Sequence, residues 1–171
     1  MAVYFTKDEG SGKVLFDWWE NLDQDRASRA VLRRASSPTE IALLPAYQRL
    51  CRRLGALNWK AWERDRFAVV VGVLSHIKAN DARSPAQAMS KHEPVKPGDK
   101  PPVSELRFMR VLDSPDPDSL FSGMRRVLPL MRSVDVIVLA NDLMDWGDAV
   151  KSDEVKKKWA YSYEWPDESV R

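Results

Sequence analysis

The sequence contains few of the side chains on which metal sites and nucleophilic catalysis usually depend. Its 171 residues include one cysteine, Cys51, and two histidines, His76 and His92. A single cysteine excludes a disulfide framework, and the histidines do not stand at zinc-ligand spacing from each other or from Cys51. Cys51 lies in an apolar and basic run, which favours a small buried thiol over a nucleophile. We therefore expect a protein that is not an enzyme and that needs no metal or cofactor.

Long apolar runs are also missing. No stretch reaches the roughly 20 apolar residues that a membrane-spanning helix needs. The first residues do not combine a charged segment with a long apolar one, as a secretory signal does. The sequence therefore predicts a cytoplasmic protein with no membrane partner.

Charge of one sign is not in excess either. The chain has 27 Lys and Arg against 25 Asp and Glu, which gives a net charge of +2. Binding to a nucleic acid would therefore depend on where the positive charge is concentrated, because the chain as a whole is not strongly basic.

The clearest concentration is a predicted helix over residues 26–35, which stops at Ser36-Ser37-Pro38. Arg26, Arg29 and Arg33 follow the spacing i, i+3, i+7 and share one face, and Arg34 stands beside them. No acidic residue between Arg26 and Ser37 neutralises this stripe from within the helix. A polyanion is its natural partner, and a solvated charged face is the alternative.

Periodic apolar residues and capping signals predict helices along most of the chain. Ser37, Pro38 and Glu40 form a capping box, Gly55 is a helix stop, and Asn58 is a cap for a helix over about 59–78. The β-branched run within that helix could be a strand, but its length and the lack of a partner strand favour a buried helix.

Two segments interrupt this pattern. A mobile start is expected around Gly10-Ser11-Gly12, and residues 80–102 are predicted to form the one long loop. The basic residues of this loop include Lys91, His92, Lys96 and Lys100. Further helices are predicted over 105–112, 120–131, 135–146 and 152–161.

These elements predict an all-α protein, a helical bundle of about seven to eight helices in two packed halves. The N-terminal half covers 13–80, the Pro- and Lys-containing loop covers 81–103, the C-terminal half covers 104–161, and a tail covers 162–171. Each half alone is small, so we expect the two to share one core.

Three aspartates recur at intervals of three, and two of them could share a helix face as a divalent metal pair. They are Asp142, Asp145 and Asp148. A structural role is the stronger interpretation, because Asp148 lies beyond Gly147 and a hard metal needs several converging oxygen ligands.

Seven tryptophans could stack on bases, but core packing explains several of them better. We expect Trp19 and Trp146 in the core. Trp59, Trp62 and Trp159 stand among charged residues and are predicted to be half exposed.

Six segments occur in the same order as in a known family. They are WWENL (18–22), AVLRRASSP (30–38), LPAYQRL (44–50), PPVSELRF (101–108), MRRVL (124–128) and LMDWGD (143–148). With this ordered set, the chain resembles the CasB family, the small subunits of type I-E CRISPR Cascade complexes.

The resemblance implies a helical, non-catalytic subunit that stabilises the R-loop between guide RNA and target DNA in antiviral defence. Its partners would be crRNA and target DNA, a second copy of itself, and the backbone and large subunits of Cascade. The family's basic positions fall on five residues here, Arg33, Arg34, Arg107, Arg125 and Arg126. Two places depart from the family's basic pattern, the acidic turn over 113–118 and Asp148, which argues against strand contacts there.

Two other functions remain open from the residues. The arginine helix with its Ser-Ser-Pro turn could belong to a helix-turn-helix regulator, although its stripe lacks the Asn, Gln, Ser or Thr that read base edges. The protein could also be a structural scaffold that does not touch nucleic acid.

Overall fold

Helices form the regular structure of this protein. The structure is a computed structural model that describes residues 3–91, 100–131, 133–148 and 150–167. Across these ranges there is no β-strand, and only two isolated bridges occur, Thr6 with Glu9 and Asn80 with Val134. The α-helices are α1 (Gly10–Asn21), α2 (Arg26–Arg34), α3 (Pro38–Ala42), α4 (Pro45–Leu54), α5 (Ala61–Leu74), α6 (Pro85–Ser90), α7 (Glu105–Leu112), α8 (Pro117–Val127), α9 (Val136–Asp145) and α10 (Ser152–Ser162). Two 3-10 helices, Ala56–Asn58 and Leu128–Leu130, complete the set.

The predicted all-α fold is confirmed. Eight of the helices have eight residues or more, as the sequence suggested, and α3 and α6 are shorter additions. No helix in the described part of the chain is long and apolar enough to cross a membrane.

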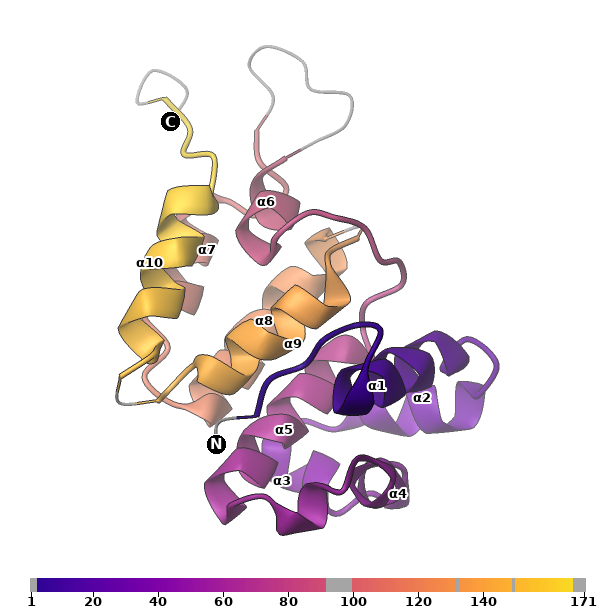
Figure 1. The fold of residues 1–171 in the computed structure, drawn as a ribbon. Helices are drawn as coiled ribbons and strands as arrows, with labels where there is room; N and C mark the ends of the chain where they lie inside the picture. The colour runs from indigo at the N-terminus through magenta and orange to yellow at the C-terminus, as the bar shows by residue number, and fades with distance from the viewer. Residues whose placement is uncertain (1–2, 92–99, 132, 149, 168–171) are drawn as a thin grey trace.

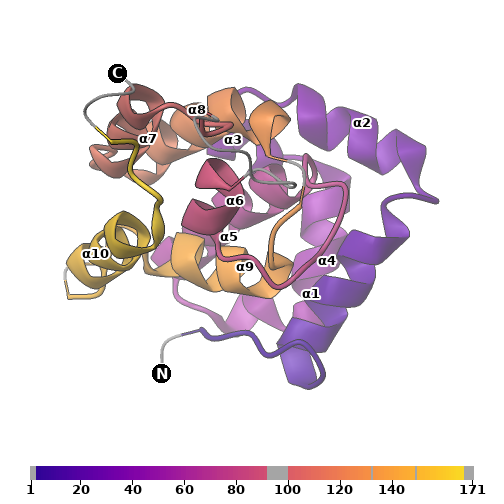
Figure 2. The same cartoon turned by 90° about the horizontal axis from the view of Figure 1, so that it is seen from above.

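Helix α5 lies at the centre of the molecule and packs against α3, α8 and α9 (Figures 1 and 2). Every residue from Phe67 to Leu74 is buried, because neighbours from both halves of the chain surround this part of the helix. The helical interpretation of the β-branched run is therefore correct. Helix α8 approaches closely at Gly72, where a Cβ atom would lie 2.5 Å from the ring of Phe121.

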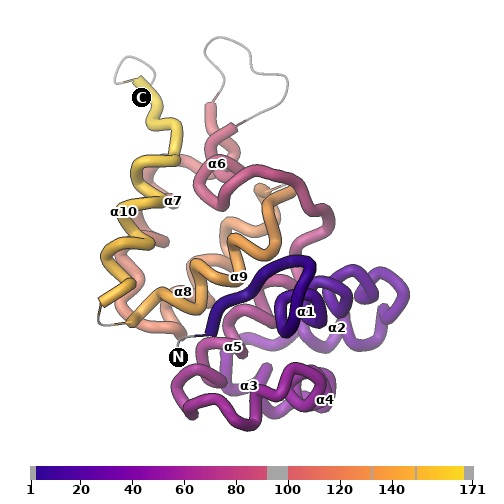
Figure 3. The backbone as a smooth tube through the Cα atoms, in the orientation of Figure 1, coloured from indigo at the N-terminus to yellow at the C-terminus, as the bar shows by residue number. Residues whose placement is uncertain are grey.

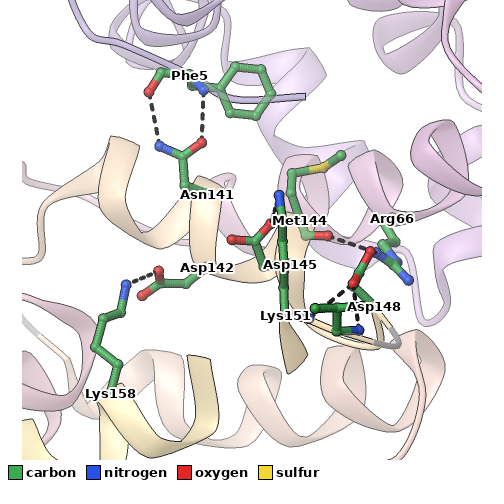
Figure 4. Close-up of polar contacts among 10 residues, drawn as sticks. Phe5, Arg66, Asn141, Asp142, Met144, Asp145, Asp148, Lys151 and Lys158 are labelled. Atoms are coloured by element: carbon green, nitrogen blue, oxygen red, sulfur yellow. Dashed lines mark hydrogen bonds and ion pairs between the residues drawn. The ribbon is translucent and has the colours of Figure 1, made fainter. Parts of the chain in front are cut away.

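The N-terminal segment lies across the body of the molecule and is held in place (Figure 3). The backbone N–H of Phe5 donates to Asn141 Oδ1 at 2.8 Å, and Asn141 Nδ2 donates to the carbonyl of Phe5 at 2.9 Å (Figure 4). The mobile start expected around Gly10 is wrong, since α1 begins at that residue. Gly12 permits this arrangement, because a Cβ atom there would lie 1.9 Å from the carbonyl oxygen of Thr6.

The segment expected to be one long loop contains helix α6. Ser84 caps it in a capping box with Gln87, and Pro85, Ala86, Ala88 and Met89 are buried. The prediction missed α6 although Ser84, Pro85 and Gln87 form a local start signal; the helix has only six residues and packs against α10. His92 and Lys96 lie outside the described residues, while Lys91 pairs with Glu164 at 3.3 Å and Lys100 is exposed.

The boundaries of α5 also differ from the expected ones. Asn58 ends a 3-10 helix instead of capping α5, whose N-cap is Lys60. The backbone N–H of Lys60 donates to Glu63 Oε1 at 3.0 Å. The helix ends at Leu74, four residues before the predicted end. The Ser37 cap and the Gly55 stop are both confirmed.

The tryptophans divide almost as predicted. Trp19 and Trp146 are buried, Trp59 is half-buried, and Trp62 is 43% exposed. The exposed position expected for Trp159 is wrong, since it is 1% exposed. Its Nε1 donates to Asp142 at 2.7 Å and its ring meets that of Trp146 edge-on, so the ring is enclosed although lysines stand beside it in sequence.

Truncation of Trp146 should destabilise the fold strongly. The ring is 1% exposed and its Nε1 donates to the carbonyl of Ser114 at 3.1 Å. We expect Trp146→Ala to lower the free energy of unfolding by about 3 to 5 kcal/mol in urea titrations. Trp62→Ala is the matched control and should change it far less; equal losses would contradict the assigned burial.

Candidate nucleic-acid interface

Helix α2 carries the first group of predicted arginines. Asp25 caps its N-terminus by accepting from the backbone N–H of Ser28 at 3.1 Å, and Arg33 and Arg34 occupy its last turn, where they complement the helix dipole. Arg26 and Arg34 are exposed, and neither forms an ion pair within the described ranges. The stripe predicted from the sequence therefore has two free positions on α2.

Arg29 is not free. Its Nη1 lies 2.8 Å from Asp23 Oδ1, and only 19% of its side chain is exposed. The sequence showed no acid within the helix, but this partner comes from the turn before it. Together with Arg33, which bonds to the backbone of Ser75, half of the expected stripe is compensated or engaged elsewhere in the fold.

Arg33 and Arg125 meet at the junction of α2 and α8. The Nε of Arg33 donates to the backbone carbonyl of Ser75 at 2.8 Å, and Nη2 of Arg125 lies 3.5 Å from the backbone oxygen of Arg33. The guanidinium of Arg125 also lies 5.7 Å from the ring centre of Phe121. Burial, followed by the charge of Arg29, lowers the pKa of Arg33.

His76 lies beside this junction, directly after α5. Burial, followed by the positive charges of Arg33, Arg125 and Arg29, lowers the pKa of its imidazole to about 4. The His76 imidazole is therefore neutral at pH 7 in the free protein. This neighbourhood could not be predicted from the sequence, because His76 lies more than 40 positions along the chain from Arg29, Arg33 and Arg125.

A second group lies between α7 and α8. Arg107, Arg110 and Arg126 line a hollow of about 480 Å³ together with Gly123 and Leu130. Arg107, Arg110 and Arg126 are all exposed. Arg110 was missed in the sequence, although its i, i+3 spacing from Arg107 is a signal that could have found it.

The seven predicted arginines therefore fall into two groups. Arg33 and Arg125 come together, whereas Arg126 lies with Arg107 in the second group. The consecutive residues Arg125 and Arg126 on α8 connect the two. Figure 2 shows α7, α8 and α2 in succession along one side of the molecule.

The three aspartates of α9 and the turn after it do not converge. Asp142 pairs with Lys158, Asp145 lies 3.6 Å from Lys151, and Asp148 lies 3.9 Å from Arg66 (Figure 4). Burial raises the pKa of Asp142, while its bonds to Lys158 and Trp159 oppose that shift. Among the described residues no three metal-ligating side chains gather at one point, and each of these carboxylates instead faces a cation.

The fold and these side chains define an all-helical protein with two arginine groups on helices from different parts of the chain. The family model for CRISPR-associated protein Cse2 matches residues 28–163, which is most of the chain. The protein therefore belongs to the Cse2 family.

Two solved structures share this fold. A chain in the crystal structure of E. coli Cascade bound to a PAM-containing dsDNA target has a TM-score of 0.65 and 22% identity, with 91% of this chain and 97% of that chain covered. CasB from Thermus thermophilus has a TM-score of 0.62 and 22% identity, with 90% and 96% covered. No curated protein sequence matches the chain.

Asp142 should stabilise the fold as the hydrogen-bond acceptor for the buried Nε1 of Trp159. Asp142→Ala leaves the buried Nε1 of Trp159 without a partner, which should cost about 1 to 3 kcal/mol, whereas half-exposed Lys158 can turn to water. Asp142→Asn keeps an acceptor and should cost less. Asp145→Ala is the control and should cost about 1 kcal/mol or less in urea titrations. If Asp142→Ala and Asp145→Ala were equal, the buried acceptor role would be wrong.

Proposed function

We propose that the protein is a non-catalytic small subunit of a crRNA-guided type I-E CRISPR Cascade complex. In this role it holds the backbone of crRNA or target DNA, stabilises the R-loop and contributes to antiviral defence. Membership of the Cse2 family supports the proposal, and so does the shared fold with a chain of E. coli Cascade bound to dsDNA. The proposed protein partners are a second copy and the backbone and large subunits.

The observation that carries the proposal is the junction of Arg33 and Arg125. Both guanidinium groups are partly buried, and their hydrogen bonds within the described chain use the Nε of Arg33 and Nη2 of Arg125. An arginine has five N–H donors, so each side chain retains donors that can hold a phosphate in bidentate geometry. Partial burial strengthens such a contact, because the local dielectric constant is lower than in water.

The arrangement suits recognition without sequence preference. Phosphate contacts position a protein on a nucleic acid, while contacts to base edges specify sequence. The α2 helix, Arg26–Arg34, offers alanine, serine, valine and leucine between its arginines. In RNA-guided recognition base pairing reads the sequence, so a subunit that holds the backbone can tip a nearly balanced strand exchange.

The helix-turn-helix alternative fits the structure less well. A recognition helix inserts a free face into the major groove, but here Arg29 is paired with Asp23 and Arg33 is tied to Ser75. Helix α3, which follows the Ser-Ser-Pro turn, has five residues and packs against α5.

Arg34 and Arg126 provide the test of the proposal, because both are exposed and lie outside the core. The isolated protein should bind single- or double-stranded oligonucleotides of any sequence, with a Kd of about 10⁻⁴ to 10⁻⁶ M at physiological salt. Arg34→Ala or Arg126→Ala should weaken binding to all sequences alike and reduce the salt slope by about one phosphate contact each. Arg53→Ala on α4 is the matched control and should leave both quantities unchanged.

In the assembled complex, the same two substitutions should shorten the lifetime of the strand-separated state and leave the guide pairing rules unaltered. If affinity, salt slope and R-loop lifetime were unchanged in both variants, Arg34 and Arg126 would be solvated surface residues without a nucleic-acid contact. That result would favour the alternative function, a structural scaffold. Protection of a single sequence by the isolated protein would favour the regulator instead.

A further inference from the structure

Two buried nitrogen atoms in the described part of the chain have no hydrogen-bond partner, and both lie in one cluster. They are Arg29 Nε and His76 Nε2. A buried polar atom without a partner is destabilising, and native proteins carry few of them. Both atoms lie below the surface beside the Arg33 and Arg125 junction, so an anion held by the remaining donors of these two arginines would act on them through its charge.

The surroundings of His76 define the charge of that ligand. Positive charges act on the imidazole from two helices, Arg29 and Arg33 from α2 and Arg125 from α8. The nearby carboxylates are engaged. Asp23 pairs with Arg29, and Glu40, which influences Arg125 only from a distance, accepts from the N–H of Ser36 at 2.7 Å.

Three guanidinium groups against one paired carboxylate leave a local positive excess. An anion with several acceptor oxygens offsets part of this excess and supplies partners for the remaining N–H groups of Arg33 and Arg125. A phosphodiester has both properties, and it is the repeating anion of the partner proposed above.

We propose that Arg29, Arg33, Arg125 and His76 form a subsite for one backbone phosphate, and that His76 takes up a proton from solvent when the phosphate binds. The inference rests on the proposed function and adds a regulation to it, a nucleic-acid affinity that increases as pH falls. In this step an O–H bond of hydronium breaks and an N–H bond of the imidazole forms, while the phosphodiester stays singly charged.

The direction of the effect follows from the charges. In the free protein the pKa of His76 is about 4, so the imidazole is neutral at pH 7. A bound phosphate offsets the guanidinium charges that disfavour the imidazolium, so the pKa of His76 is higher in the complex. Between the free and the bound pKa, binding takes up one proton and the affinity rises up to tenfold for each pH unit of acidification.

The test measures oligothymidylate binding by the full chain from pH 8 to pH 5.5, a range in which the phosphodiesters do not titrate. The wild-type affinity should rise several-fold at the acidic end. His76→Gln, which keeps a neutral polar side chain, should bind with nearly wild-type affinity at pH 8 and lose this rise. His92→Gln is the matched control and should keep it.

A second measurement does not depend on the stability of the His76 variant. The imidazole signals of the His92→Gln protein report His76 alone, and NMR titration should give a higher pKa with oligothymidylate bound than without it. Salt-sensitive binding with an unchanged His76 pKa, or with a pH dependence that survives His76→Gln, would overturn this inference and leave the proposed function standing. Absence of any oligonucleotide binding at any pH would overturn both.

Discussion

The burial of α5 is the constraint on which the rest of the structure depends. Its apolar stretch from Phe67 to Leu74 is enclosed by helices from both parts of the chain, so the helix cannot shift without opening the core. Gly72 allows the ring of Phe121 to lie against the α5 backbone, which fixes α8 at close range. Any larger residue at this position would force α8 outward.

The same helix also sets the position of the arginines. Directly after its last turn, the backbone carbonyl of Ser75 accepts from Arg33 and thereby holds the end of α2. Because Phe121 and Arg125 share α8, the packing that fixes the phenylalanine ring also brings Arg125 to Arg33. The core therefore places like charges together, an arrangement that destabilises a protein unless an anion compensates it, and perturbed pKa values of this kind cluster at functional sites.

Local signals in the sequence predicted much of the fold. The Ser37 capping box, the Gly55 stop and the long apolar run each depend on residues close in the chain, and the structure has all three features. Helix α6 was missed although its Ser84 capping box is a local signal. The burial of Trp159 was missed because it depends on contacts with distant elements. The N-terminal segment was missed for the same reason, since its two bonds to Asn141 span 136 residues.

The sequence could name candidate residues for the site but not their geometry. Arginine spacing identified the α2 stripe, and the resemblance to the CasB family added Arg107, Arg125 and Arg126. Spacing within one helix could not reveal that Asp23 compensates Arg29 or that Arg126 joins Arg107 and Arg110. It also could not reveal that His76 lies among three arginines, because that neighbourhood exists only when α2, α5 and α8 pack together.

The most direct test of this account is a double-mutant cycle on Arg33 and Arg125. Oligonucleotide affinity is measured for the wild type, Arg33→Ala, Arg125→Ala and the double variant, with the thermal midpoint of each as a check on folding. If the two side chains hold the same phosphate, their effects on the binding free energy should be coupled by about 0.5 to 3 kcal/mol. Additive effects, within about 0.5 kcal/mol, would show that α2 and α8 do not form one binding surface.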